Sequence, residues 1–367
     1  MSSSSVSDGI LKFATQYSIY SGFIIFSFGV IGNVLNLLVF TQLKLFRTNR
    51  CAFYITIESI SNFIYQFSLL STTMLTSLYG DDATGRSLNK SNTINLIRNT
   101  TMLTSLYGDD ATGRSFIWCK LRYILGQICA LTTIYMICFT VVDQFFSTNH
   151  RFNLRQMCTL KLGRYVSSIF ICFAIIHSIL LGTSYNIQPT LGCVLSNYVW
   201  IQYSTFFFYP ILIGFLPIVI ASSFSILAYH NVRHIVRRQL PIVRRKLDKQ
   251  ITAMVLTRVM VFVCLTLPYN VYRIYAINFP ISPSMPMAYA IGRLIQVIFT
   301  SIYIINYIIN FYIFIIFSSR FRRQARLVLV KKCWQRWKYW CCSINNRIEP
   351  DNNIERRNSQ MESEENI

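Results

Sequence analysis

Long stretches of this 367-residue chain contain almost no charged side chain. Residues 13–43, 123–142 and 165–232 have no Lys, Arg, Asp or Glu, and 51–80 has only Glu58. A helix needs roughly 20 apolar residues to span the hydrocarbon layer of a bilayer, where its backbone must satisfy its own hydrogen bonds. Because 53% of the residues are hydrophobic, a soluble domain of this composition would aggregate. We therefore predict an all-α membrane protein.

The C-terminal half continues the pattern. Residues 251–272 contain only Arg258, and 274–292 and 294–319 contain no charge, with three prolines marking a turn between 280 and 286. The expected architecture is a seven-transmembrane helix bundle, followed by a short amphipathic helix. The seven helices are predicted at 18–41, 51–78, 116–146, 165–184, 204–230, 249–278 and 287–317. An outer tail would occupy 1–17, the bundle domain 18–330 and an inner tail 331–367.

The basic residues indicate how the bundle is oriented. The formal net charge is +21, but most of the 35 Lys and Arg fall in connections that seven crossings place on one side of the membrane. Cytoplasmic loops collect Lys and Arg. We therefore expect a multi-pass plasma-membrane protein with an extracellular N-terminus and a cytoplasmic C-terminus, in contact with lipid and not with nucleic acid. The Ser-rich start is not predicted to be a cleavable signal peptide.

The eleven cysteines do not form a disulfide scaffold, because most lie inside predicted helices, where a thiol packs as a small apolar group. On this topology only Cys119 and Cys193 reach the oxidising side, and we expect them to pair. Cys333, Cys341 and Cys342 follow the last helix among Lys and Trp residues. They are candidates for palmitoylation at the inner membrane surface.

A repeated segment extends the first outer loop, 72–115. Residues 72–87 and 100–115 are identical, and two identical copies do not resemble a solenoid, whose repeats diverge and number at least three. The interpretations are a recent in-frame duplication, neutral in effect, or an error in the gene sequence. The inserted part carries glycosylation sequons at Asn89 and Asn99.

Several positions together resemble the rhodopsin-like G-protein-coupled receptors. Gly32-Asn33 stands in the first helix, Ile134 lies fifteen residues after Cys119, Pro217 lies in the fifth helix, and Phe262 lies six residues before Pro268. The resemblance implies an activation switch of Ile134, Pro217, Phe262 and Pro268. Prolines permit kinks, and a bulky aromatic side chain between two kinks can adopt two packings.

The inner ends of the helices depart from that family. Its Asp-Arg-Tyr is Asp143-Gln144-Phe145 here, and its Asn-Pro-x-x-Tyr is replaced by a segment beginning at Asn310. The position that holds the arginine in the family's inactive state is Asp248. We expect a Gln144–Asp248 hydrogen bond as a weak latch, with Asp143, Gln144 and Asp248 at the site of cytoplasmic coupling.

Polar residues inside the predicted bundle form a second candidate group: Asn33, Glu58, Asn306 and Asn310. They could be an inward polar cluster with a functional role, or simply join helices by hydrogen bonds. A carboxyl group at membrane depth, such as that of Glu58, is costly unless it is protonated or paired.

The candidate ligand-binding residues lie in the outer half of the bundle: Tyr123, Gln127, Tyr209, Arg273 and Gln296. Gly126 stands where receptors for amines have an Asp, and no lysine lies between Lys249 and Lys331 to form a retinal Schiff base. Arg273 could bind a carboxylate or carbonyl group, or reach toward lipid headgroups. We expect a short peptide ligand, because the end of the seventh helix is similar to that of neuropeptide receptors, including invertebrate FMRFamide-type receptors.

Three functions compete at this stage. A receptor would transmit ligand binding to a heterotrimeric G protein. A decoy would bind ligand without signalling, as the change at Gln144 favours. A transporter is disfavoured by the single acid expected to be buried, by the lack of inverted repeats and by the lack of a charged pore lining. No enzyme motif, cofactor site or metal-ligand spacing is found.

Overall fold

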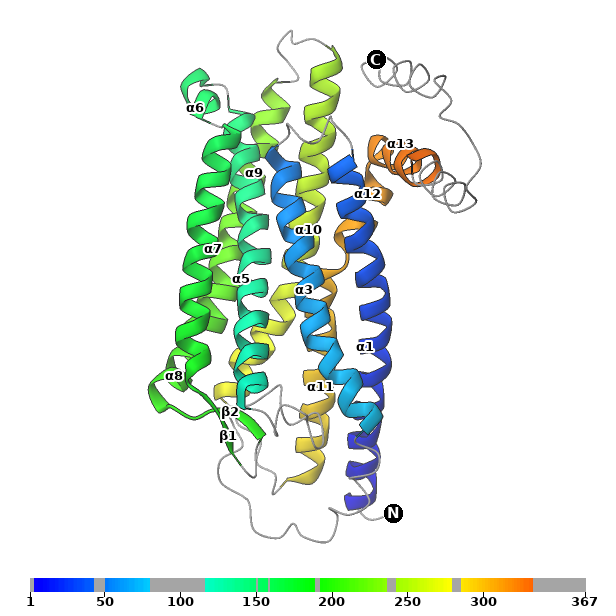
Figure 1. Ribbon diagram of the computed structural model, residues 1–367, viewed down its shortest axis with the longest axis vertical. Coiled ribbons are helices and arrows are strands. Elements are labelled where there is room, and N and C mark those ends of the chain that lie inside the picture. Colours follow the sequence, from blue (N-terminus) through cyan, green and yellow to red (C-terminus); the bar gives the residue numbers. More distant parts are fainter. Residues whose placement is uncertain are drawn as a thin grey trace, which may run out of the picture.

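The structure is a computed structural model that describes residues 3–42, 50–79, 116–149, 151–157, 159–188, 192–235, 242–278 and 285–332. Its long helices lie side by side in one bundle (Figure 1). These helices are α1 (Ser3–Gln42), α3 (Arg50–Tyr79), α5 (Phe116–Ser147), α7 (Leu160–Thr183), α9 (Leu216–Ile235), α10 (Ile242–Asn278) and α11 (Pro286–Ile304). Shorter elements are α6 (Phe152–Met157), α8 (Tyr198–Tyr203), η2 (Ser204–Phe215), η3 (Ile305–Tyr307), α12 (Asn310–Phe317), α13 (Ser319–Arg326) and η4 (Leu327–Lys332).

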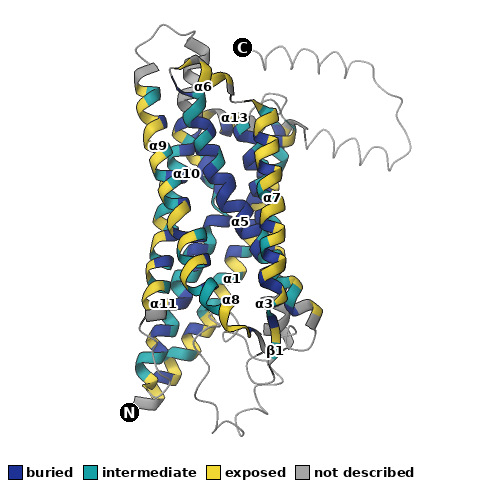
Figure 2. Cartoon of the chain, turned by 90° about the vertical axis from the view of Figure 1, so that its left-hand side faces the viewer, coloured by how far each residue is buried: buried dark blue, intermediate teal, exposed yellow. Residues whose placement is uncertain are grey.

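The helices contact one another around a ring. α3 packs between α1 and α5, α5 packs against α7 and α9, α10 packs against α9 and α11, and α11 returns to α1. Buried residues are concentrated on α5, which runs through the interior of the bundle (Figure 2). The predicted all-α fold is confirmed for the described residues.

Six helical segments in the described part of the chain are long and apolar enough to cross a membrane. They are Ser5–Gln42, Cys119–Ser147, Leu160–Thr183, Tyr198–Arg233, Thr252–Ala276 and Pro286–Ile305. This supports a helical membrane protein with several crossings. α3 is 30 residues long and is not among the six, so a count of seven crossings stays a prediction.

The first helix is longer than the sequence indicated. The tail expected at 1–17 is helical from Ser3, and α1 runs on without a break to Gln42. Ser7 and Ala14, two turns apart, are both buried. One face of the helix therefore stays covered beyond the predicted start at 18, and this burial favours continued helix over a free tail.

The helix predicted at 204–230 is divided into the π-helix η2 and α9, and the helical run begins earlier, with α8. Pro210 lies inside η2, and a proline removes one helical N–H donor. The Tyr135 hydroxyl donates to the Leu212 carbonyl oxygen at 3.1 Å, and the Cys138 thiol to the Pro217 carbonyl oxygen at 3.7 Å. Side chains of α5 thus supply donors where the backbone of this helix is irregular.

The helix predicted at 287–317 is divided as well, into α11, the 3-10 turn η3 and α12. Beyond it, α13 and η4 form the expected amphipathic helix. Phe321, Ala325 and Val328 are buried on one face, against a cluster that includes Phe40 and Phe314. The arginines of α13 that the structure describes are exposed.

A hairpin not anticipated from the sequence covers one end of the bundle. Strands β1 (Tyr185–Gln188) and β2 (Gly192–Leu195) pair antiparallel, with Asn186 opposite Val194. The hairpin lies at the end where α1 begins, and α13 lies at the opposite end (Figure 1). We refer to these as the hairpin end and the α13 end.

Candidate functional site

A buried ion pair joins two helices in the middle of the bundle. Arg258 on α10 donates from Nη2 to Glu58 Oε1 on α3 at 3.0 Å. The residues are only 4% and 2% exposed, so the attraction is weakly screened by solvent. The pairing that Glu58 was expected to need is therefore supplied by the one charged residue within 251–272.

Two asparagines at the break in the last helix complete this ion-pair network. Asn310 Nδ2 donates to Glu58 Oε1 at 2.6 Å, and the Asn306 backbone oxygen accepts from Arg258 Nη2 at 3.0 Å. Asn306 Nδ2 donates to Thr266 Oγ1 at 3.0 Å. The turn η3 matters here, because irregular helix geometry leaves backbone carbonyls available to partners from other helices.

Asn33 joins the same region from α1. Its Nδ2 donates to the Tyr307 carbonyl oxygen and to the Gly29 carbonyl oxygen, both at 3.0 Å, and Gln66 donates to the Tyr307 oxygen at 3.4 Å. The structure thus brings Glu58, Asn306 and Asn310 together. Asn33 is bonded to Tyr307, the residue that follows Asn306. Arg258 was not assigned a role from the sequence, although its isolation in an apolar segment was a signal for one.

A second polar group lies nearer the hairpin end and is centred on Arg273. Its guanidinium lies over the ring of Tyr209 in η2, 3.4 Å from the ring centroid. Its Nη1 donates to the Tyr269 hydroxyl at 2.9 Å. Both tyrosines pack against the main buried cluster. The side chain is therefore turned into the bundle and not outward to lipid headgroups.

The hairpin adds a stacked pair of tyrosines to this group. Tyr123 on α5 stacks on Tyr185 of β1, with ring centroids 4.0 Å apart, and the Tyr185 hydroxyl interacts with that of Tyr209. Burial raises the pKa of Tyr185 above its usual value. Its hydroxyl is therefore neutral at physiological pH and acts as a hydrogen-bonding group.

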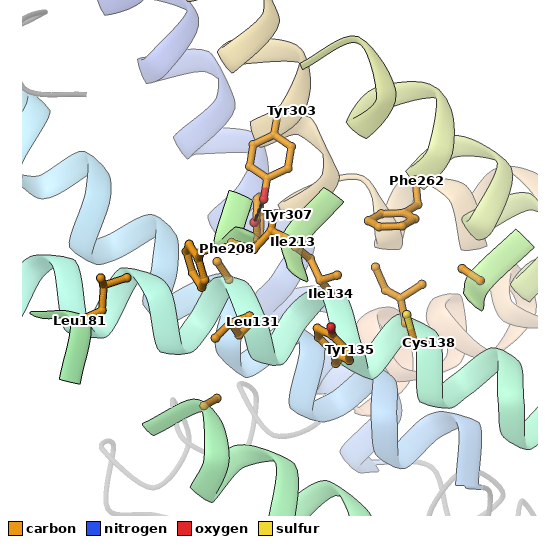
Figure 3. Close-up of a cluster of buried hydrophobic side chains, with 14 of the residues drawn as sticks. Leu131, Ile134, Tyr135, Cys138, Leu181, Phe208, Ile213, Phe262, Tyr303 and Tyr307 are labelled. Atoms are coloured by element: carbon orange, nitrogen blue, oxygen red, sulfur yellow. Dashed lines mark hydrogen bonds between the residues drawn. The ribbon is translucent and has the colours of Figure 1, made fainter. Parts of the chain in front are cut away.

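Further tyrosines connect Arg273 with the middle of the bundle. Tyr269 stacks on Tyr303 at 4.6 Å, the Tyr303 and Tyr307 hydroxyls are 2.7 Å apart, and Tyr307 stacks on Tyr65 at 4.4 Å. Figure 3 shows Tyr303 and Tyr307 with their hydroxyl ends turned toward each other. Tyr307 is next in sequence to Asn306, which binds Arg258. Sequence reasoning selected Tyr123 and Tyr209 and missed the other aromatic members, because tyrosines are frequent throughout this chain.

The two predicted glutamines differ in their surroundings. Gln127 is 7% exposed, and neither its Nε2 nor its Oε1 has a hydrogen-bond partner among the described residues. Gln296 is also buried, and its Oε1 accepts from Arg293 at 3.3 Å. Gln127 is thus an unsatisfied amide inside the bundle, whereas Gln296 has a protein partner.

The predicted switch residues lie in the interior between the two polar groups. Ile134 and Phe262 are almost fully buried in one cluster, on α5 and α10 respectively (Figure 3). Pro217 is buried at the start of α9, and Pro268 is partly buried inside α10. That these four residues act as a switch stays a prediction.

At the α13 end, Gln144 has partners other than the expected one. Its Nε2 donates to Thr252 Oγ1 at 2.6 Å, and the Cys51 thiol donates to its Oε1 at 3.6 Å. Asp143 pairs with Arg50 at 3.4 Å. The Asp248 side chain lies outside the described residues, one turn before Thr252 on α10. Gln144 thus does connect α5 with α10, through Thr252.

Several predicted modifications stay predictions. Cys119 is fully buried and is not among the free thiols of the described residues. The Cys193 side chain lies outside those residues, although its backbone belongs to β2. Asn89, Asn99, Cys333, Cys341 and Cys342 also lie outside the described residues.

Comparison with known proteins does not identify a family. No protein-family model matches the chain, and no curated protein matches it. Within the described residues, no group of three or more His, Cys, Asp or Glu side chains could hold a metal ion.

Proposed function

We propose that this protein is a divergent rhodopsin-like receptor that binds a short extracellular peptide and passes a conformational signal to a heterotrimeric G protein. In this proposal the hairpin end faces outward and the α13 end faces the cytoplasm. The described basic residues of α6, α7 and α13 gather at the α13 end, as expected for cytoplasmic loops.

One observation carries the proposal: a continuous series of contacts and one peptide bond links the two polar groups. It runs from Arg273 through Tyr269, Tyr303 and Tyr307 to the next residue in the chain, Asn306. The Asn306 backbone oxygen accepts from Arg258, which is paired with Glu58. These contacts provide a physical route by which an occupant near Arg273 could alter the helix break that supports the ion pair.

In the proposed mechanism the ion pair stabilises the resting arrangement. Arg258 on α10 bonds to both α3 and η3, so movement of α10 away from α3 must break these bonds. Closer to the α13 end, the Gln144–Thr252 hydrogen bond joins α10 to α5 as well. A ligand that displaces Tyr303 or Tyr307 would weaken the support from Asn306 and favour movement of α10.

The alternative is a decoy that binds ligand without coupling to a G protein. It is favoured by Gln144, which stands where the rhodopsin-like receptors have an arginine. Here the Gln144 side chain is hydrogen-bonded to Thr252 and Cys51. A transporter has less support. In the described residues, the two opposite charges in the middle of the bundle, Glu58 and Arg258, are buried and paired with each other, and they do not line an open path.

Second-messenger output separates receptor from decoy. The chain would be expressed with and without 72–99, at matched surface levels, and challenged with a library of short peptides. We expect ligand-driven or constitutive output from both forms. A Gln144→Leu variant should show raised basal output, because it loses the bond to Thr252. Peptide binding to the surface with no output under any condition would support the decoy.

A further inference from the structure

Arg273 has no acidic partner in the described part of the chain. Of the acidic side chains described there, Glu58 is bound by Arg258, Asp143 is bound by Arg50, and Asp8 lies near the start of α1. Its partners among these residues are neutral: Nη1 donates to the Tyr269 hydroxyl, and the guanidinium also interacts with Tyr209. Arg273 is half-buried, and a partly desolvated cation without a counterion is less favourable than a paired one, so an anion at this place would be favoured.

The orientation of the Arg273 guanidinium shows which of its edges can bind an anion. Nη1 is used by Tyr269, and the flat face lies on Tyr209. Nε is buried and has no acceptor in the part of the chain that the structure describes. Nε and Nη2 lie on the same edge of the planar group, and this pair of parallel N–H donors matches the two oxygens of a carboxylate. Stacking on Tyr209 and the bond to Tyr269 fix the plane of that edge.

Gln127 is a second, independent observation. It is more than nine-tenths buried, and within the described ranges both ends of its amide lack a partner. It lies one helical turn from Tyr123, which stacks on Tyr185. Tyr185 in turn interacts with Tyr209, the residue on whose ring Arg273 lies. A buried amide with donor and acceptor both unsatisfied fits a peptide group, which offers one acceptor and one donor.

Building on the receptor proposed above, we infer that its ligand carries a carboxylate, bound side-on by Nε and Nη2 of Arg273, next to a peptide group that hydrogen-bonds to Gln127. A peptide with a free C-terminal carboxylate has both groups in adjacent positions. A peptide ending in an amide lacks the anion. The free acid is therefore the preferred ligand class.

Paired probes test this with the full-length protein purified in nanodiscs. Short peptides with aromatic C-terminal residues, and N-acetylphenylalanine as the smallest probe, would each be prepared as free acid and as amide. Binding is measured by thermal stabilisation of the protein, which a bound ligand raises by mass action, and affinity is then determined by titration up to millimolar concentration. Neither measurement depends on G-protein coupling.

We expect free acids to stabilise the wild-type protein and the matching amides to bind at least about 10-fold more weakly. Arg273→Gln should lower acid affinity about 30-fold or more, because it removes one side of a half-buried charge-assisted pair. Arg273→Lys should be intermediate, since it keeps the charge but loses the planar edge. Lys120→Gln is the matched control, because Lys120 is bonded to the Thr183 carbonyl oxygen and its loss removes one charge at the same end.

Three results would overturn the inference: equal binding of acids and amides, unchanged acid binding in Arg273→Gln, or no acid that stabilises the wild-type protein. If Arg273→Gln does not fold, Tyr269→Phe replaces it. That variant keeps the stacked ring but loses the anchor of Nη1, and acid affinity should fall while amide affinity does not. Acid-selective binding without any cellular signal would leave this inference intact and contradict the receptor function instead.

Discussion

Neutralising Glu58 should destabilise the protein strongly, although the change is small in shape. Glu58→Gln keeps an oxygen that can accept from Asn310 Nδ2, which is 2.6 Å from Oε1 in the structure. It removes only the negative charge that faces Arg258 at 3.0 Å. The guanidinium would then remain buried with neutral partners alone.

The magnitude follows from the separation and the burial. Two unit charges 3.0 Å apart attract by about 5 kcal/mol at an effective dielectric constant of ~20. Part of this offsets the desolvation of both groups, and removal of one member of a buried pair typically costs about 3–5 kcal/mol. We expect Glu58→Gln and Arg258→Met each to lower the free energy of unfolding by about this amount.

A double-mutant cycle isolates the charge interaction. The variant with both substitutions should be less destabilised than the sum of the single ones, with a coupling energy of about 2–3 kcal/mol. Unfolding can be followed in detergent by the reactivity of free thiols, because Cys51, Cys129 and Cys138 are buried in the folded protein.

Arg50→Gln is the matched control for that cycle. It breaks the Arg50–Asp143 pair at the α13 end, whose side chains are 22% and 10% exposed, and should cost no more than about 1 kcal/mol. Additive effects of Glu58→Gln and Arg258→Met, or a cost no larger than that of Arg50→Gln, would refute the reasoning that the pair is buried and strong.

Three further predictions concern a tyrosine, a helix interface and the topology. Tyr307→Phe removes the hydroxyl that is 2.7 Å from that of Tyr303 but keeps the ring that stacks on Tyr65. We expect a stability loss of about 1 kcal/mol and weaker ligand-driven output with unchanged ligand binding; unchanged output would show that Tyr307 is not part of the route between the two polar groups. Gly182→Val places a side chain against Ile124 across the α5–α7 interface and should lower the unfolding free energy by about 1–3 kcal/mol, as measured by thiol reactivity; wild-type stability would show that the interface is looser than described. Epitope tags at Met1 and Ile367 should stain from opposite sides of the plasma membrane, and staining of both on intact cells would contradict the odd number of crossings.

The helices themselves were predictable because lipid constrains them strongly. Uninterrupted apolar segments gave the positions of the long helices to within a few residues at many of their ends, such as 51–78 for α3 and 116–146 for α5. The breaks were not predictable. The turn η3 has no proline, and η2 extends well beyond Pro210, so both depend on partners supplied by other helices.

The polar groups were predictable only in part. Asn306, Asn310 and Glu58 were grouped because polar side chains at membrane depth need partners. Arg258 could not be assigned as the partner, because spacing along the sequence does not show which faces of α3 and α10 meet. The orientation of Arg273 was open for the same reason, since stacking on Tyr209 depends on the geometry of η2.

The central claim is that the ion pair between Glu58 and Arg258 holds α10 in its resting position. Spin labels at Leu162, at the start of α7, and at Ala253 on α10 would report the distance between these helices by pulsed electron resonance, in a background without other accessible cysteines. Glu58→Gln should shift the distance distribution to longer values than in the wild type, while Arg50→Gln should not. Identical distributions in all three proteins would contradict the claim.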